Sequence, residues 1–260
     1  MKNPFKETPG YTYLVDWMKS HNQTPFEFQE KAWHYYSKGY SGLIVAPTGF
    51  GKTFSVFLGV LIDFMNAPET YSKGLKLIWI TPIRSLAKDL ARAMQEAIDS
   101  VGLDWTVGIR NGDTSTKDKV AQKKQMPDVL LMTPESLHLL LAQKDRDKLF
   151  KNLKAVVVDE WHELMGNKRG VMIELALAFL SHQTHKLRVW GITATIGNID
   201  EALEVLIPNS SKKIKITAKE QKKIDILSVY PDEVSLLPWA GHLGSKLVHK
   251  VVPIILASKS

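Results

Sequence analysis

The sequence contains no cysteine, which excludes a disulfide framework and any metal site built on thiolates. A chain without cysteine suits a reducing cytosol, so we expect a cytoplasmic protein. The sequence also lacks any apolar run near the roughly 20 residues that a membrane span needs. Its first residues, MKNPFKETPGYTYL, have no apolar core of the kind that signal peptides carry. We therefore expect neither a membrane partner nor a secretory signal.

The excess of positive charge is modest, with 34 Lys and Arg against 27 Asp and Glu and a formal net charge of +7. This balance leans toward a polyanionic partner, although many basic proteins never touch nucleic acid. The 260 residues are 44% hydrophobic, which is enough for a full-sized core in one large domain or two small ones. No repeat period or low-complexity tract interrupts the sequence.

Short apolar runs rich in β-branched residues alternate with helical patterns along the chain. Several runs are apolar at consecutive positions, as parallel strands buried on both faces require. Residues 83–98 form a helical pattern with apolar Ile83, Leu86, Leu90, Met94 and Ala97. The alternation predicts an α/β fold, a doubly wound and mainly parallel sheet flanked by helices. The expected strands are 42–47, 75–82, 106–110, 128–133, 154–160 and 187–195.

The C-terminal part has a different pattern. Residues 211–231 predict two further strands joined by a lysine-rich turn. Alternation places Lys213 and Lys215 on one face of the first strand, which indicates a nucleic-acid patch or, as we favour, a solvated edge that protects the sheet. Residues 243–259 predict a closing helix in which Pro253 makes a kink or a stop. We expect a lead-in over 1–24 and one domain over 25–260, cut from a longer protein.

A glycine-rich loop, APTGFGKT, lies between an expected strand and a helix that begins at about Lys52. The phosphate-loop pattern is G-x-x-x-x-G-K-[ST], which the end of the loop fits, while Ala46 stands where the first glycine is expected. The glycines would let backbone N–H groups turn toward phosphates at the positive end of the helix. Lys52 would neutralise the β- and γ-phosphates, and the Thr53 hydroxyl would hold Mg²⁺. The candidate nucleotide-binding residues of the loop are Ala46, Pro47, Thr48, Gly49, Phe50, Gly51, Lys52 and Thr53.

A second acidic motif supports the first. The segment KAVVVDEWHEL places Asp159 and Glu160 at the carboxyl end of an apolar strand, where α/β sheets bind ligands. Asp159 can accept a hydrogen bond from a Mg²⁺-bound water, and Glu160 can orient and deprotonate an attacking water. The same pair could instead be a helix cap and a solvated charge. Together the two motifs predict a nucleoside triphosphatase.

The segments APTGFGKT, DEWH and TAT (193–195) together resemble the DExH-box helicases of superfamily 2, in which the first loop glycine is commonly alanine. The resemblance implies a RecA-like fold, with ATP and Mg²⁺ as cofactors. It also implies a catalytic set of Lys52, Asp159, Glu160 and His162, and a metal held by Thr53 and Asp159. PFEFQEKAW (25–33) resembles the adenine-sensing segment of this superfamily, with Gln29 reading the base edge and Phe26 or Phe28 nearby.

Three longer segments resemble the large helicase-related (Lhr) family, and within it the DNA-ligase-associated DExH-box helicases. They are PDVLLMTPESLHLLLA, VVVDEWHELMGNKRG and GITATIGN. This resemblance implies the first motor domain of an ATP-dependent DNA helicase or 3′-to-5′ single-strand translocase in DNA repair. It also implies a nuclease and a DNA ligase as partners, and association with the nucleoid if the source is bacterial.

The same resemblance implies which residues hold single-stranded nucleic acid by its phosphates. Hydroxyl groups among them could also be ordinary helix caps, and the arginine could be a solvated charge. The candidates are Thr81, Arg84, Gly112, Thr133 and Ser136. Lys168 and Arg169 would add contacts or form a mobile surface loop. His162 would couple hydrolysis to this groove through the hydroxyls of Thr193 and Thr195, and Trp161 would pack in the core.

Two other functions stay open. Backbone contacts discriminate poorly between DNA and RNA, so an RNA helicase is an alternative. A nucleotide-dependent adaptor with little turnover is another, although Glu160 argues against it. In the family that the chain resembles, a second motor domain supplies arginines worth roughly 10³–10⁵ in turnover. We therefore expect the 260 residues alone to bind nucleotide weakly and to hydrolyse ATP barely above background.

Overall fold

The structure of the protein is a computed structural model, which describes residues 4–184, 186–194, 196–208, 210–219, 226–230 and 247–257. Its contacts divide the chain into two compact units, residues 1–220 and residues 221–260. In the second unit the described residues are 226–230, which form no regular structure, and helix α11 (Val248–Ala257). All the described strands belong to the first unit.

In the part of the chain that the structure describes, seven strands form one sheet in the order β3-β4-β2-β5-β6-β1-β7. Every neighbouring pair is parallel, so the predicted doubly wound parallel sheet is confirmed. All six strands expected before residue 196 are present. The strands are β1 (Ser41–Val45), β2 (Leu77–Ile80), β3 (Val107–Arg110), β4 (Val129–Met132), β5 (Ala155–Val158), β6 (Arg188–Thr193) and β7 (Lys213–Thr217).

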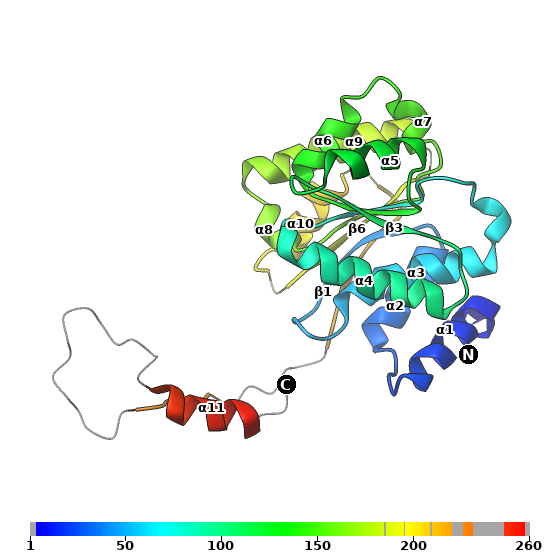
Figure 1. Cartoon of the computed structure of the whole chain (residues 1–260). Helices are drawn as coiled ribbons and strands as arrows, with labels where there is room; N and C mark the ends of the chain where they lie inside the picture. Colours follow the sequence, from blue (N-terminus) through cyan, green and yellow to red (C-terminus); the bar gives the residue numbers. More distant parts are fainter. Residues whose placement is uncertain are drawn as a thin grey trace, which may run out of the picture. The chain divides into compact units, whose positions relative to one another are not determined.

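Helices cover both faces of the sheet (Figure 1). After β1 the chain moves through α3 and α4 toward β3 at one edge, and it then returns through α5 to α10 toward β7 at the other. Because crossovers between parallel strands are right-handed, this reversal places α3 and α4 on one face and the later helices on the opposite face. None of the described helices is long and apolar enough to cross a membrane.

The helices of the first unit have the following bounds: α1 (Pro9–Ser20), α2 (Glu27–Ser37), α3 (Lys52–Asn66), α4 (Arg84–Ser100), α5 (Thr116–Lys124), α6 (Pro134–Leu141), α7 (Arg146–Phe150), α8 (Trp161–Leu164), α9 (Lys168–Gln183) and α10 (Ile199–Leu206). Two short 3₁₀ helices, η1 (Pro4–Glu7) and η2 (Pro68–Thr70), precede α1 and follow α3.

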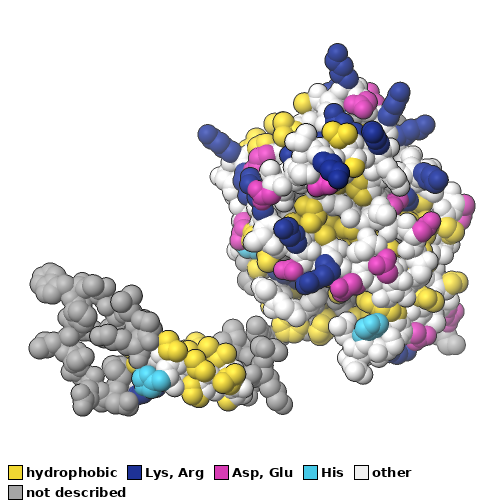
Figure 2. All heavy atoms as spheres, in the orientation of Figure 1, with side chains coloured by type: hydrophobic (Ala, Val, Ile, Leu, Met, Phe, Trp, Pro, Cys, Tyr) yellow, Lys and Arg dark blue, Asp and Glu magenta, His cyan; other side chains and the backbone are white. Residues whose placement is uncertain are grey.

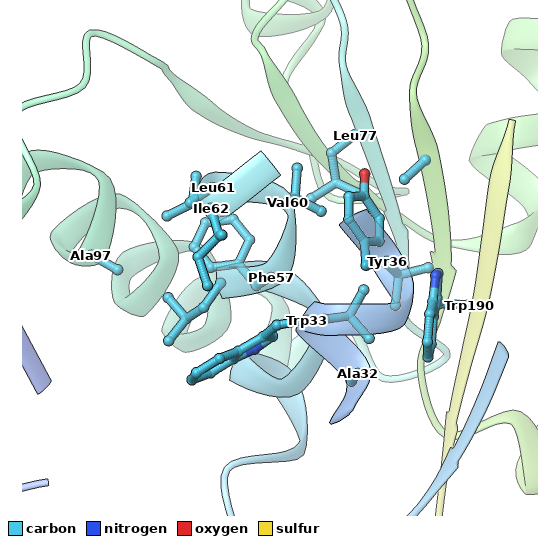
Figure 3. Packing of buried hydrophobic residues seen from close by; sticks show 14 of the residues in the cluster. Ala32, Trp33, Tyr36, Phe57, Val60, Leu61, Ile62, Leu77, Ala97 and Trp190 are labelled. Atoms are coloured by element: carbon cyan, nitrogen blue, oxygen red, sulfur yellow. The ribbon is translucent and has the colours of Figure 1, made fainter. Parts of the chain in front are cut away.

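The core consists of two apolar clusters, one on each face of the sheet. Along β5, Ala155 and Val157 belong to the cluster under α1 to α4, whereas Val156 and Val158 belong to the cluster under α6 to α10. This alternation explains why the strand is apolar at consecutive positions. Figure 3 shows large side chains of the first cluster, including Trp33 of α2, Phe57 of α3 and Trp190 of β6.

The N-terminal helix α1 adds to the first cluster. Leu14 and Met18 are buried there, and Gly10 lies so close to α3 that a Cβ atom would stand 2.8 Å from the Ile62 carbonyl oxygen. Gly10 also donates its N–H to the Asn66 side chain at 2.8 Å. Helix α1 is thus packed on α3, and the limits of 1–24 for a lead-in and 25–260 for a domain stay a prediction.

The C-terminal expectations are met in part. Strand β7 pairs with β1, and its Lys213 and Lys215 form ion pairs with Glu204 and Asp200 of the first unit, as a solvated edge requires. The expected second strand was wrong for residues 226–230, and residues 220–225 lie outside the described residues. The stop at Pro253 was also wrong, because α11 continues to Ala257.

A buried ion pair joins α3 to the start of β6. Arg188 donates to the carboxylate of Asp63 at 2.8 Å, and the Tyr71 hydroxyl donates to the same oxygen at 2.7 Å. The guanidinium lies 4.0 Å from the centre of the Tyr36 ring. Only 13% of the arginine side chain and 17% of the aspartate side chain are exposed. Each charge therefore depends on the other for compensation.

We expect Asp63→Asn to lower the free energy of unfolding by about 3 kcal/mol, because it leaves a buried guanidinium without a countercharge. Urea unfolding followed by circular dichroism measures the change. The matched control is Asp16→Asn, whose partner Lys19 lies at 3.0 Å in an exposed pair. This control should change the free energy by less than about 0.5 kcal/mol. Equal effects of the two variants would contradict a structural role of the buried pair.

Candidate nucleotide and nucleic-acid site

The predicted functional residues lie along one edge of the sheet. Because all strands are parallel, their carboxyl ends share this edge, where open α/β sheets bind ligands. The loop 46–51 follows β1, Asp159 follows β5 and Thr193 ends β6, and these strands lie in one half of the sheet order. The predicted nucleic-acid residues follow β2, β3 and β4 in the other half. The edge thus has a nucleotide half and a nucleic-acid half.

The glycine-rich loop has the backbone that phosphate binding requires. Gly49 and Gly51 have φ angles of 94° and 67°, in the left-handed region that favours glycine. Gly51 caps α3, which begins at Lys52 as expected, so the first N–H groups of the helix face the loop. A Cβ atom at Gly51 would stand 2.8 Å from the Gln29 side-chain nitrogen. This close approach makes a side chain at position 51 doubly unfavourable.

Gln29 links the segment before α2 to the loop. Its buried amide donates to the Gly51 carbonyl at 3.0 Å, and its oxygen accepts from the Phe26 N–H at 2.9 Å. The ring of Phe26 lies 5.6 Å from the ring of Phe50 and is stacked at 5.9 Å on Phe28. The segment expected at the base and the loop expected at the phosphates are therefore in contact, and the reading of adenine by Gln29 stays a prediction.

The proposed catalytic side chains form a connected network. The Lys52 ammonium, 8% exposed, lies 3.5 Å from Oε2 of Glu160. The same oxygen lies 3.6 Å from Nδ1 of His162, and that nitrogen lies 3.0 Å from the Thr193 hydroxyl. The contact expected between His162 and Thr193 is present, while Thr195 lies outside the described residues. The network runs from the phosphate loop to the end of β6.

Glu160 has a strained backbone. Its φ of 47° lies in the left-handed region, and its N–H donates to the Asp159 carboxylate at 2.9 Å. A non-glycine residue in this region costs on the order of 1–3 kcal/mol and is typical of functional sites. Trp161, the first residue of α8, is buried as expected and donates its indole N–H to the Ala202 carbonyl at 3.0 Å. This anchor fixes the turn that carries Glu160.

Asp159 accepts a hydrogen bond from Trp79, a residue that the sequence patterns did not single out. The buried indole of Trp79, in β2, donates to Oδ2 of Asp159 at 3.3 Å. Burial and the negative charge of Glu160 raise the pKa of Asp159 to about 6. The only sequence signal for this contact is an aromatic residue within the otherwise aliphatic strand LIWI.

The residues at this edge fit a magnesium ion held with phosphate. Mg²⁺ keeps several waters and takes one or two carboxylates together with substrate phosphates. Asp159 and Glu160 place two carboxylates beside one ammonium group, that of Lys52, so negative charge exceeds positive charge there. Thr53 is the second residue of α3, directly after Lys52, and its part in holding the metal stays a prediction.

The hydroxyl groups of the nucleic-acid half are internally bonded. The Thr133 hydroxyl accepts from the Ser136 N–H at 3.4 Å and caps α6. The Thr81 hydroxyl accepts from the Ile83 N–H at 3.4 Å. Thr81, Thr133 and Ser136 are all buried. The capping role considered from the sequence is thus present at Thr133, whereas Thr81 does not cap α4, whose N-cap is Ile83. A contact of either with nucleic acid stays a prediction.

Exposed groups surround these buried hydroxyls. The guanidinium of Arg84 lies 3.4 Å from the Asp113 carboxylate. A Cβ atom at Gly112 would stand 3.0 Å from the same guanidinium. Lys168 and Arg169 begin α9, so the expected mobile loop was wrong at these positions. Arg169 pairs with Glu135 at 2.7 Å and also donates to a carbonyl before α4. It ties three segments of this half together.

Comparisons with known proteins identify the family of the chain. The DEAD/DEAH box helicase family matches residues 26–202. The ATP-dependent helicase Lhr-Core of Sulfolobus acidocaldarius is 33% identical over 207 residues, which are 75% of this chain and 23% of the relative. The Lhr-Core helicase of Methanocaldococcus jannaschii is 29% identical over 259 residues, 95% of this chain and 31% of the relative. The chain spans less than a third of the length of these relatives.

Solved structures have the same fold. The Mycobacterium smegmatis helicase Lhr bound to ssDNA and AMP-PNP superposes with a TM-score of 0.79 and 24% identity, covering 100% of this chain and 34% of that one. The DUF1998 helicase MrfA bound to DNA and AMPPNP has a TM-score of 0.66 and 26% identity, covering 80% of this chain and 29% of that one. The fold is thus a RecA-like helicase domain, distantly similar to the Lhr-Core helicases. The chain belongs to the DEAD/DEAH box helicase family.

Proposed function

We propose that the chain is the ATP-binding first motor domain of an ATP-dependent DNA helicase or single-strand translocase. The observation that carries this proposal is the network from Lys52 through Glu160 and His162 to Thr193. It connects an ammonium group suited to bind phosphate, a carboxylate suited to act as a base, and a histidine that contacts the end of a strand. Such an arrangement has a clear use in a motor that couples hydrolysis to movement.

In this proposal each residue has a definite task. The backbone N–H groups of the loop and Lys52 bind the β- and γ-phosphates, while Gln29 reads the base. Glu160 orients the attacking water and accepts its proton. Mg²⁺, held by Asp159 and Thr53, would neutralise charge on the phosphate oxygens.

Two contacts are candidates for coupling the nucleotide half to the nucleic-acid half. The first, between His162 and Thr193 at the end of β6, lies within the nucleotide half. Trp79 contacts Asp159 from β2, whose next residue is Thr81 and whose following helix begins with Arg84. A change in charge at Asp159 would alter its hydrogen bond to Trp79, and so act on the strand that precedes Thr81 and Arg84. This second link makes β2 a candidate route for coupling.

DNA is the favoured nucleic acid because the related solved structures, Lhr and MrfA, are described as bound to ssDNA and to DNA. Sequence motifs add the finer assignment to DNA-ligase-associated helicases, with a role in DNA repair beside a nuclease and a ligase. A second motor domain of the same full-length protein would close on the nucleotide, which is consistent with the greater length of the relatives. An RNA helicase and an adaptor with little turnover are the alternatives.

The test is steady-state ATP hydrolysis by this chain and by a longer form that includes a second motor domain. We expect the longer form to be stimulated by single-stranded DNA more than by matched RNA, and the 260 residues alone to stay near background. The reason is that arginines from a second domain contribute roughly 10³–10⁵ in turnover. Robust DNA-stimulated turnover by the 260 residues alone would refute the divided site, and stronger stimulation by RNA would favour the RNA helicase.

We expect Glu160→Gln in the longer form to retain ATP binding and to lose about 10²–10⁴ in turnover, because the amide cannot accept the proton of water. Equilibrium binding of a fluorescent ATP analogue and single-turnover hydrolysis measure the two effects. Glu163→Gln is the control, since Glu163 lies on the same short helix and takes no part in the network. Near-normal turnover of Glu160→Gln would place the base elsewhere.

We expect Trp79→Phe to raise the Mg²⁺ concentration needed for half-maximal ATP binding, because Asp159 loses the donor that orients its carboxylate. Binding of ATP without Mg²⁺ should not change. Trp190→Phe is the control, because its indole donates at 3.0 Å to the Tyr40 carbonyl, before β1. Titrating Mg²⁺ at fixed nucleotide separates the variants, and identical Mg²⁺ dependence in both would show that Trp79 only fills the core.

A further inference from the structure

A groove runs along the free edge of β3, between α4 and α5. Its volume is about 1360 Å³, and its floor includes Val107, Ile109 and Pro127. Arg84 and Lys88 of α4 form one wall, and Lys124 of α5 lies on the other. Figure 2 views this face and shows hydrophobic side chains between Lys and Arg side chains. No residue of the nucleotide site lines this hollow, and of the predicted nucleic-acid residues only Arg84 does.

An added β-strand does not suit the groove, although β3 is an edge strand. The N–H of Val107, which faces away from β4, donates to the Gln95 side chain at 2.8 Å. The carbonyl of Ile109 accepts from the Gln122 side chain at 2.9 Å. Arg110 holds Gln122 in place by donating to its oxygen at 3.2 Å. An incoming peptide strand would find these backbone groups already bonded, so the ladder that strand addition requires cannot form.

The charges of the groove favour an anionic occupant. Three cationic side chains, Arg84, Lys88 and Lys124, line it against two carboxylates. Asp113 pairs with Arg84 at 3.4 Å, whereas Asp118 accepts from the Ser115 hydroxyl at 2.7 Å and keeps its negative charge. Lys88 and Lys124 are exposed, and neither forms an ion pair with any carboxylate among the described residues. Two ammonium groups without a carboxylate partner, next to apolar side chains, suit a single-stranded nucleic acid. Its phosphates can bind the ammonium groups while the flat faces of its bases lie on the apolar side chains.

The groove opens onto the nucleic-acid half of the carboxyl edge. Arg84 and Asp113, which line its mouth, flank Gly112, and Arg84 is one of the proposed strand contacts. A strand held by Arg84 at this half of the edge is thus already at the lining of the groove. On the basis of the proposed function, we propose that the groove holds the continuation of the single strand, with Lys88 and Lys124 bound to two of its phosphates and Val107 and Ile109 against its sugars and bases.

The test measures the affinity of this chain for oligo(dT) that is lengthened one nucleotide at a time. In Lys88→Ala/Lys124→Ala we expect affinity to stop rising at a shorter length than in the parent. For long oligonucleotides the slope of log K against log salt should become less negative by about 1.4, since each lost phosphate contact removes about 0.7. The control is Lys38→Ala/Lys151→Ala, exposed lysines before β1 and β5 at the amino edge, which should leave the length profile unchanged.

Arg84→Ala separates failure of the groove from failure of the proposed function. If Arg84→Ala weakens binding at every length while the groove variant matches the parent at every length, the groove proposal is overturned. The proposed binding of nucleic acid at the carboxyl edge of the sheet is then retained. If neither variant changes the affinity, both proposals fall. If the groove variant and the control lysines weaken all lengths equally, the effect is general electrostatic attraction, and the groove is likewise rejected.

Discussion

The uniform direction of the strands is the constraint on which the rest of the structure depends. A parallel sheet needs crossovers, and these crossovers bury both of its faces under helices. Polar chemistry is thereby excluded from the faces and confined to the ends of the strands. Asp159, Thr193 and the phosphate loop, which are far apart in the sequence, come together because each follows or ends a strand of the same direction.

The sequence was sufficient for features that depend on near neighbours. Consecutive apolar residues indicated the buried strands, and the spacing of Gly49 and Gly51 indicated the loop and the start of α3 at Lys52. The contact of His162 with Thr193 was expected only from family resemblance, since nothing local joins residues 31 positions apart. Contacts between distant parts of the predicted site were therefore expected from family resemblance and not from local patterns.

Other contacts could not be predicted because they depend on register between distant strands. Trp79 reaches Asp159 only because Ile80 is aligned with Val158 across β2 and β5. The left-handed backbone of Glu160 has no local signal, since glutamate rarely takes that conformation. A buried threonine such as Thr133 shows the opposite difficulty: its sequence suits both a cap and a phosphate contact, and only the cap is visible in the fold.

The pairing of Lys52 with Glu160 has a consequence for nucleotide exchange. Any phosphate that binds the ammonium group must compete with a carboxylate already 3.5 Å away, so part of the binding free energy is offset before the reaction begins. The same contact re-forms as the site empties, which favours the departure of a spent nucleotide. An internal competitor of this kind weakens the binding of substrate and product alike. Weaker product binding suits an enzyme whose turnover depends on the release of its product.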